Sequence, residues 1–575
     1  MSKRKGNVLC AFISAFLVLV MIFGTVSSLN LRSANAENDK TDFSSEITAV
    51  RYAHGEKISI LPEEVRLFSE STTLDIDYLK DLYEYTDNHR KFNINNNERL
   101  VELYRETDAF NPVDIVLRWQ SSLDNVRSYK VRVAYDNKFT ECVIIEPNAD
   151  INEGVAVLNP LAGTTYYWQV IATLDNDDKV YSRIFDFTTE NSLRTVTVEG
   201  VSNTRDIGGY ETVYGYVKQG LVYRSARLES LAYTEAGLDT FKNELGIKSE
   251  IDLRGTTEIG IMPTNEQNAA GLNADNCFVW DWETPYYADG ITTSDVEIES
   301  SGIDGKNNWE KVKAIMSVFA EKENYPIDFH CAIGRDRTGT FAALLKAVLG
   351  FSEQDIINDY FISAFSTTGT WDKNVLMGNK DGILFVLKYL NSFNGDTLAD
   401  RTAEYLITKC GMTQTQIDDI RNIMTGKDGY EVEIPAYNTQ PDTDNYAGYA
   451  FVTFEKFGTP KAVKAVLYGE TVNAPFDLGD GLTWTVDGAE YDFSAGVMKD
   501  MTVKASEKKR YEIKVVSTGA INSQETVTVN EGESFDFSIL QKDGYDFTVV
   551  SDDGKVITEL TVIGKSTINV IYVRK

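Results

Sequence analysis

Cys331 and Arg337 are the residues of this sequence whose types and spacing most directly suggest chemistry. They bracket the loop segment Cys331-Ala332-Ile333-Gly334-Arg335-Asp336-Arg337. A thiol is a nucleophile only as its thiolate, and a nearby guanidinium group and a helix N-terminus both favour that anion. A loop between a strand and a helix also offers successive backbone N–H groups to one anion. We therefore expect a tetrahedral oxyanion to bind in this loop, above the sulfur of Cys331.

The residues between and after this pair have separate expected roles. Arg337 should bind two oxygens of the anion with its planar fork, which a lysine could not do. Ala332, Ile333, Gly334 and Arg335 form the expected phosphate-binding segment. Within it, Gly334 should let the backbone approach the ligand, because glycine has no Cβ atom. Thr338 should donate its hydroxyl to the thiolate and help the sulfur to leave.

This loop resembles the CX5R signature of the protein tyrosine phosphatases. The run from Gly334 to Gly339 is close to the Gly-Lys-Asp-Arg-Thr-Gly form of a bacterial branch with tyrosine, serine and phosphoinositide phosphatases. Further matches to that branch are Arg205 to Tyr210, Tyr223 to Ala226, Ile251 to Arg254 with Glu258, and Asp359-Tyr360. Two residues depart from the pattern: Ile333 replaces an alanine, and Arg335 replaces a lysine and keeps its charge.

The resemblance implies a two-step reaction without a metal ion or other cofactor. Cys331 would take the phosphoryl group in line, and water would then hydrolyse the phosphocysteine. A general acid must protonate the leaving oxygen. Asp336 is the first candidate, because this branch carries an aspartate inside the loop; alternatively, its carboxylate only stabilises a helix N-terminus. Asp281, between two tryptophans, is the second candidate.

Five other residues are candidates for supporting roles. His330 could donate a hydrogen bond to the thiolate or could only pack at the end of the strand, and the resemblance favours the hydrogen bond. Asp252 is expected to orient groups of the loop. Arg224 and Arg254 could contact the substrate or form internal ion pairs, and we favour ion pairs. Cys277 could trap oxidised Cys331 as a disulfide, but we favour a lone buried thiol.

The elements around the loop show the alternation of an α/β domain over residues 196–428. Residues 247–253 and 326–331 are predicted to be buried strands, and residues 309–319 an amphipathic helix. The residues after the loop, 338–349, predict a helix that ends at Gly350. Ser352 then begins another helix, with Asp355 in its first turn.

Short alternating apolar runs fill residues 106–192 and predict an antiparallel sandwich. Leu117, Trp119, Leu158, Tyr166, Trp168 and the segment 185–189 resemble a fibronectin type III domain. That resemblance implies an all-β Ig-like fold, and a spacer is the favoured role over a binding module. Residues 37–105 carry no usable motif and are left unassigned.

A polar linker over residues 429–447 precedes two β-rich stretches, 448–508 and 509–575. Landmarks of the first are Tyr449, Gly469 to Val472, Asp487-Gly488 and Met501 to Ala505; those of the second are Tyr511, Gly532 to Phe535, Asp553-Gly554 and Ile568 to Ile571. The similar spacing predicts an internal repeat of two units. The first resembles the small β-repeats of Gram-positive surface proteins, which implies a ligand at the cell surface or on a host.

Composition indicates an exported, acidic, multidomain protein. With 575 residues the chain exceeds one hydrophobic core, and its net charge of −31 argues against nucleic-acid partners. Residues 1–36 resemble a signal peptide, with a basic start, an apolar run and Ala34-Asn35-Ala36. We therefore expect secretion, with attachment to the membrane through an uncleaved N-terminal segment as the alternative.

Four functions remain open at this level. The first is hydrolysis of phosphotyrosine, with dual specificity included, on a phosphorylated protein. The second is hydrolysis of phosphoinositides or inositol phosphates, which Arg335 beside the pocket would suit. The third is a surface adhesion protein whose phosphatase-like core is inactive. The fourth, sulfur transfer or arsenate reduction by another CX5R protein, is opposed by the matches upstream of the loop.

Overall fold

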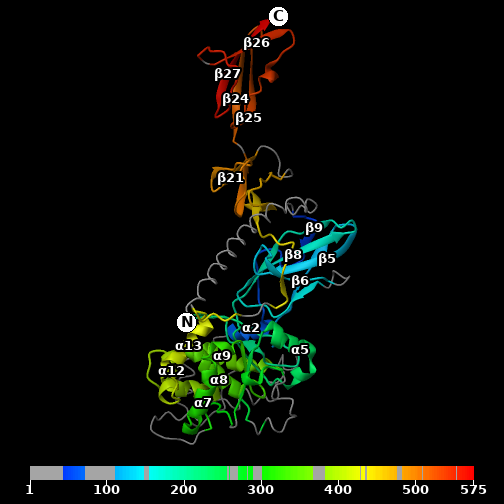
Figure 1. Ribbon diagram of the computed structural model, residues 1–575. Helices are drawn as coiled ribbons and strands as arrows, with labels where there is room; N and C mark the ends of the chain where they lie inside the picture. The colour runs from blue at the N-terminus through cyan, green and yellow to red at the C-terminus, as the bar shows by residue number, and fades with distance from the viewer. Residues whose placement is uncertain are drawn as a thin grey trace, which may run out of the picture. The chain divides into compact units, whose positions relative to one another are not determined.

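The computed structural model of the chain describes residues 43–70, 110–147, 154–255, 258, 270–280, 283–288, 301–366, 382–427, 429–433, 437–475, 482–507, 509–551 and 553–575. A mixed α/β region occupies the middle of the sequence, and β-rich regions precede and follow it (Figure 1). No helix within these ranges combines the length and the apolar character that a bilayer crossing requires. The expected signal peptide and the candidate acid Asp281 lie outside the described residues.

The central sheet has five strands. Their order is β11 (Arg205–Asp206), β14 (Val222–Ser225), β17 (Ile327–His330), β15 (Ser249–Asp252) and β16 (Cys277–Val279). All neighbours pair in parallel except β11, which runs antiparallel to β14. The register places Ser225 and Asp252 level with His330, at the edge where the parallel strands end. Residues just beyond His330 therefore meet the ends of the two flanking strands, where ligands bind in such sheets.

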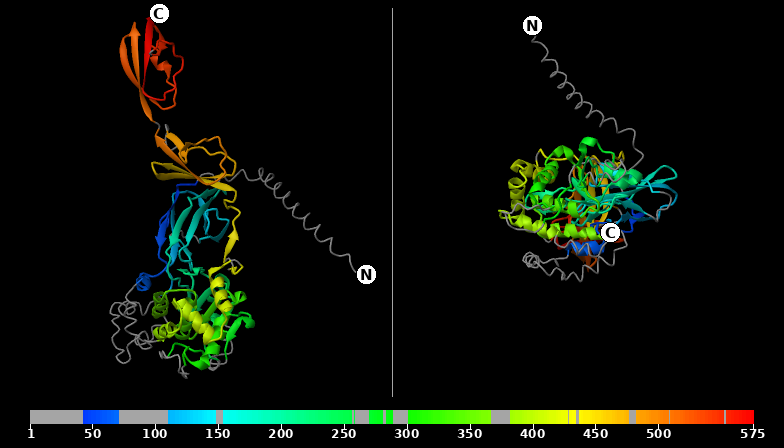
Figure 2. Two further views of the ribbon diagram at one scale, coloured as in Figure 1. Left: turned by 90° about the vertical axis from the view of Figure 1, so that its left-hand side faces the viewer. Right: turned by 90° about the horizontal axis from the view of Figure 1, so that it is seen from below.

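The described helices of this region include one before the loop and five from the loop onward, and the helix that begins in the loop is buried. The helices are α7 (Trp309–Val318), α8 (Asp336–Val348), α9 (Glu353–Ile362), α11 (Gly382–Asn391), α12 (Leu398–Thr408) and α13 (Gln414–Thr425). Helix α8 packs against β14, β17, α9, α11 and α12, so all its residues from 338 to 348 are buried. Figure 2 shows the α/β region, in green and yellow, from two further sides. The predicted helices at 309–319 and 338–349 are confirmed. Ser352 caps α9 by accepting a hydrogen bond from the N–H of Asp355.

The β-rich region before the α/β region contains a sheet that two distant segments extend. Its middle strands are β6 (Glu141–Ile145), β5 (Val126–Ala134), β8 (Thr165–Leu174) and β10 (Phe185–Thr189). Strand β2 (Glu56–Ile58) pairs with β10, and β18 (Thr439–Pro441) pairs with β6. A further pair joins β1 (Ile47–Ala49) to β4 (Trp119–Ser121). Residues that the sequence left unassigned or placed in a linker thus form strands, because a three-residue strand is too short to show a period.

Two C-terminal sheets share one pairing plan. In the first, β19 (Tyr449–Lys456) pairs antiparallel with β20 (Thr459–Leu467) and parallel with β23 (Met501–Glu507), which pairs antiparallel with β21 (Leu482–Val486). In the second, β24 (Arg510–Gly519), β25 (Ser523–Asn530), β27 (Ser566–Arg574) and β26 (Tyr545–Val550) pair in the same way. Each sheet has its own apolar cluster. The similar spacing noted in the sequence thus corresponds to the same order of four strands in both sheets, and the first sheet has β22 (Ala489–Glu490) as a fifth strand beside β21.

Candidate active site

The carbonyl oxygens of the loop after β17 accept hydrogen bonds from residues that surround the loop. The donors are the Arg227 N–H to Ala332 O at 3.4 Å, Asn203 Nδ2 to Ile333 O at 3.0 Å, and Arg224 Nη2 to Gly334 O at 2.7 Å. In a trans peptide the N–H points opposite to the C=O. The N–H groups of residues 333, 334 and 335 therefore face away from these donors, and none has a partner among the described residues. Three adjacent unpaired amides are therefore available to bind an anion.

Gly334 is required for a different reason from the expected approach to a ligand. Its φ is +72°, a left-handed conformation that favours glycine. A Cβ atom here would lie 2.4 Å from the carbonyl oxygen of Ser225, at the end of β14. The absence of a side chain therefore serves the packing of the loop against the neighbouring strand.

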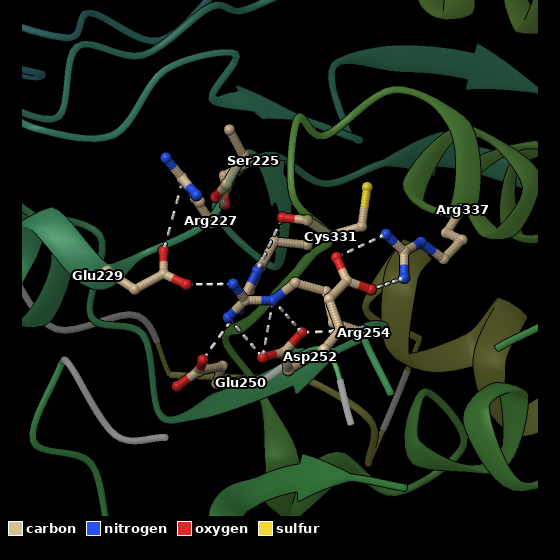
Figure 3. Close-up of polar contacts among 11 residues, drawn as sticks. Ser225, Arg227, Glu229, Glu250, Asp252, Arg254, Cys331 and Arg337 are labelled. Carbon is tan, nitrogen blue, oxygen red and sulfur yellow. Dashed lines mark hydrogen bonds and ion pairs between the residues drawn. The ribbon is translucent and has the colours of Figure 1, made fainter. Parts of the chain in front are cut away.

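Cys331 is buried directly after β17, beside Arg337 (Figure 3). Burial raises the pKa of its thiol, but the Arg337 guanidinium and the hydroxyl and N–H of Thr338 lower the pKa and prevail, against a smaller opposing effect of Asp336. The Thr338 hydroxyl is buried and has no other hydrogen-bond partner among the described residues. The thiol is therefore more acidic than an ordinary cysteine, as a nucleophile requires.

Arg337 holds the carboxylate of Glu258 in its fork. Nη1 donates to Oε2 at 2.6 Å and Nη2 donates to Oε1 at 3.1 Å. These two N–H groups form the bidentate arrangement that would bind two oxygens of a phosphoryl group. Glu258 was one of the sequence matches but carried no expected role.

Asp336 is the first residue of α8, and several donors converge on one of its carboxylate oxygens. Oδ1 accepts hydrogen bonds from Tyr287 Oη and from Arg335 Nε at 3.0 Å, and Arg335 Nη2 lies 2.9 Å away. Oδ2 accepts no hydrogen bond from the part of the chain that is described. Arg335 is 3% exposed, so its guanidinium faces Asp336 rather than a second phosphate. Oδ2 is therefore available to contact a substrate oxygen or a water molecule.

Sequence comparison agrees with this geometry. Residues 196–426 match the profile of the tyrosine phosphatase family. This range includes the loop, Glu258, Arg224 and Arg254. Residues 196–426 are a tyrosine phosphatase family domain. A search of curated proteins finds no match for the chain. The family supports phosphomonoester hydrolysis, and we refer to this segment below as the phosphatase domain.

His330 supports the loop of the phosphatase domain through the backbone. Its Nε2 lies 2.9 Å from Glu250 Oε1, and its Nδ1 lies 3.3 Å from the carbonyl oxygen of Cys331. Burial lowers the pKa of the ring, but the carboxylates of Asp252 and Glu250 raise it to about 9. The ring is therefore cationic at neutral pH and donates from both nitrogens. The expected bond to the sulfur is replaced by a bond to the carbonyl group of Cys331.

Asp252 and Arg254 form the internal ion pair that the sequence favoured (Figure 3). Arg254 donates to both oxygens of Asp252, and its Nη1 also contacts Glu229. Burial raises the pKa of Asp252, but His330 and Arg254 prevail and lower it. Arg254 is 2% exposed, so it orients this cluster rather than meeting solvent.

Glu250, Asp252 and His330 could also hold a metal ion, since their ligand atoms lie within 4.8 Å of one another. One imidazole and two carboxylates would suit Zn²⁺. However, Arg254 already occupies both oxygens of Asp252, and His330 carries a proton at neutral pH. Arg254 and His330 already pair with Asp252 and Glu250, so the possible ligand atoms are engaged without an ion.

Arg224 is fully buried, and its guanidinium group links the loop to Asp359. It donates to Asp359 at 2.5 Å and to the carbonyl of Gly334 at 2.7 Å. Arg205 and Lys346 also lie against Asp359, at 2.8 and 3.5 Å. Burial raises the pKa of Asp359, but these cations hold it far below the ordinary value. Two guanidinium groups against one carboxylate leave a net positive charge beside the loop.

Cys277 is placed poorly for a disulfide with Cys331. It lies on β16, with β15 between β16 and β17, and its register partner is Glu250. Two strand spacings of about 4.8 Å exceed the Cα separation of a disulfide. Burial and the charge of Glu250 raise the pKa of the Cys277 thiol to about 11. The geometry thus supports the lone thiol, but Cys277 is half-buried and not buried as expected.

Three polar residues of the site were not singled out in the sequence. Asn203 lies two residues before the matched Arg205 motif, so its proximity to that motif was a usable signal. Glu250 alternates with Asp252 along a buried strand, which is the pattern of a polar sheet face. Tyr287 carried no signal, because it lies in a segment without a motif and is 49 positions from Asp336.

Proposed function

We propose that the phosphatase domain hydrolyses phosphotyrosine in proteins through a phosphocysteine intermediate. The observation that carries the proposal is the acidified thiol of Cys331 beside Arg337, in a loop with three unpaired amides. The thiolate attacks phosphorus and the P–O bond to the phenol breaks. Asp336 gives its proton to the phenolate oxygen.

In the second step water attacks the phosphocysteine and the S–P bond breaks. Asp336 accepts the proton of the water, and inorganic phosphate and the Cys331 thiolate are released. Arg337 and the loop amides bind the equatorial oxygens in both steps, where negative charge is concentrated. Thr338 stabilises the departing thiolate with its hydroxyl.

The engagement of Arg335 favours a singly phosphorylated substrate. A phosphoinositide or inositol phosphate would need a cation for its second phosphate, and the basic residue of the loop is already paired with Asp336. Phosphotyrosine needs one anion site and an acid for its leaving group, both of which the loop provides. Phosphoinositides therefore become the alternative substrate class.

We infer that the flanking regions present this enzyme outside the cell. The pattern of residues 1–36 supports secretion, and the strongly acidic composition opposes nucleic-acid partners. We assign the fibronectin type III-like region as a spacer and the C-terminal sheets as surface-protein repeats. The shared pairing plan of those sheets supports this assignment. A cell-surface or host ligand would bind to these β-rich parts.

A substrate panel tests the enzyme proposal. Phosphotyrosine, phosphoserine and doubly phosphorylated inositol substrates are compared at equal concentration, with wild type, Cys331→Ser and a chelator. We expect turnover of phosphotyrosine that the chelator leaves intact and Cys331→Ser abolishes. Preference for the inositol substrate would support the alternative class, and no turnover of any substrate would support an inactive binding module.

A further inference from the structure

Backbone hydrogen bonds hold Tyr287 against α8, one turn after Asp336. Its N–H donates to Thr340 Oγ1 at 2.8 Å, and its carbonyl accepts from the N–H of Ile303 at 2.8 Å. Thr340 lies four residues after Asp336 and therefore on the same face of the helix. Tyr287 also has a φ of +58°, a left-handed conformation that is unfavourable for tyrosine. Such strain persists only where the surroundings impose it, and it is common at functional sites.

The ring of Tyr287 is fixed from a second side. Gly382, the first residue of α11, lies so close that a Cβ atom there would be 2.3 Å from Tyr287 Cε1. Tyr360 meets the ring edge-on, with centroids 6.2 Å apart. The ring therefore has little freedom to turn, and its hydroxyl is directed at one place.

That place is the carboxylate of Asp336. Tyr287 Oη donates to Oδ1, and Tyr360 Oη lies 2.5 Å from Tyr287 Oη. Burial raises the pKa of the Tyr287 phenol far above its ordinary value, and Tyr360 and Asp336 raise it further. The hydroxyl consequently remains a proton donor to Oδ1 throughout the working pH range.

We propose that Tyr287 is a positioning residue for Asp336: it fixes Oδ1, so that Oδ2 is presented to the leaving oxygen and then to the attacking water. This inference rests on the proposed role of Asp336 as the acid and base of the reaction. A carboxylate has a broad torsional preference about its last bond, so one anchored oxygen determines where the other points. Proton transfer requires that alignment within hydrogen-bonding distance.

Two aryl phosphates test the proposal. The phenolate of phenyl phosphate needs a proton to leave, whereas the leaving group of 2,4-dinitrophenyl phosphate departs as a stable anion. We expect Tyr287→Phe to lower kcat about 10-fold or more on phenyl phosphate and less than about 2-fold on the dinitrophenyl ester, within the range of general acid catalysis. Tyr286→Phe is the matched control, because no described residue receives a hydrogen bond from its hydroxyl. It should match wild type on both substrates.

A double-mutant cycle separates positioning from a structural role. In an Asp336→Asn background, Tyr287→Phe should have no further effect on phenyl phosphate. Gly382→Ala, which displaces the ring, should show the same selective loss and provides a second variant if Tyr287→Phe does not fold. Equal losses on both substrates, or additive effects in the cycle, would overturn the proposal. Failure of the proposed function would appear differently, as wild-type turnover that survives Cys331→Ser.

Discussion

The carboxylate of Glu258 occupies the guanidinium fork of Arg337, with N···O distances of 2.6 and 3.1 Å. Substrate needs the same two N–H groups. Arg337 is 16% exposed and Glu258 is 40% exposed, so the pair is open enough to exchange partners. Glu258 thus holds the fork in a binding-ready orientation and competes with phosphate for it.

Removing the charge of Glu258 should therefore tighten phosphate binding. We expect Glu258→Gln to lower the inhibition constant of inorganic phosphate by about 3-fold or more, which corresponds to about 0.7 kcal/mol. Competitive inhibition of aryl phosphate hydrolysis measures this constant. Glu283→Gln is the control, because Glu283 is exposed. Weaker phosphate binding in Glu258→Gln would show that orientation of Arg337 outweighs competition.

His330 should make stability depend on pH between its ordinary and its folded pKa. The folded pKa is about 9, above the ordinary value of 6.5, so its contribution is complete below pH 6.5 and is lost as pH rises through 9. At about 1.4 kcal/mol per pKa unit the loss is on the order of 3 kcal/mol.

Urea unfolding at pH 6, 7.5 and 9 measures this loss in wild type and in His330→Gln. The variant should lose the part of the pH dependence that His330 contributes, so its stability should fall less than that of wild type between pH 6 and pH 9. His54→Gln is the matched control, because its side chain is 83% exposed, and it should follow wild type. An unchanged slope in His330→Gln would contradict the role of the buried imidazolium.

The sequence predicted the parts of this site that lie in one short stretch. The loop, its preceding strand and its following helix have local signals, so Cys331 and Arg337 could be found before any coordinates. Tyr287 and Asn203 reach the loop from distant segments, and tertiary packing brings them there. No periodicity in the sequence encodes such contacts.

The same distinction explains the roles that changed. Arg335 was expected at the pocket because of its charge, but its guanidinium is buried against Asp336. Gly334 was expected to let a ligand approach the loop backbone. Instead, its missing side chain allows the backbone of Ser225 to pack closely against the loop. Residue type was informative in both cases, whereas the identity of the neighbour depended on how β14 and α8 meet the loop.

Arg224 and Arg227 permit a matched test of the loop's outer supports. Arg224 contributes its side chain to Gly334 O, whereas Arg227 contributes only its backbone N–H to Ala332 O. Arg224→Lys keeps the charge but cannot bridge Asp359 and the loop with separate nitrogens. We expect it to lower kcat/KM by about 10-fold, or about 1.4 kcal/mol, while Arg227→Lys stays near wild type. Equal effects of the two variants would contradict a supporting role for the Arg224 side chain.

Thr338 should set the pH at which the nucleophile becomes active. Its hydroxyl and N–H lower the pKa of Cys331, so Thr338→Ala removes the hydroxyl and should raise the pKa of the thiol toward the ordinary value. The thiolate fraction then falls at a given acidic pH, and the acid limb of the kcat/KM profile moves to higher pH. The rate of alkylation by iodoacetamide against pH measures the same shift without substrate, because only the thiolate reacts. Thr338→Ser keeps the hydroxyl and should retain the wild-type limb; a limb that stays unmoved in Thr338→Ala would assign the acidity of Cys331 to Arg337 and the loop amides alone.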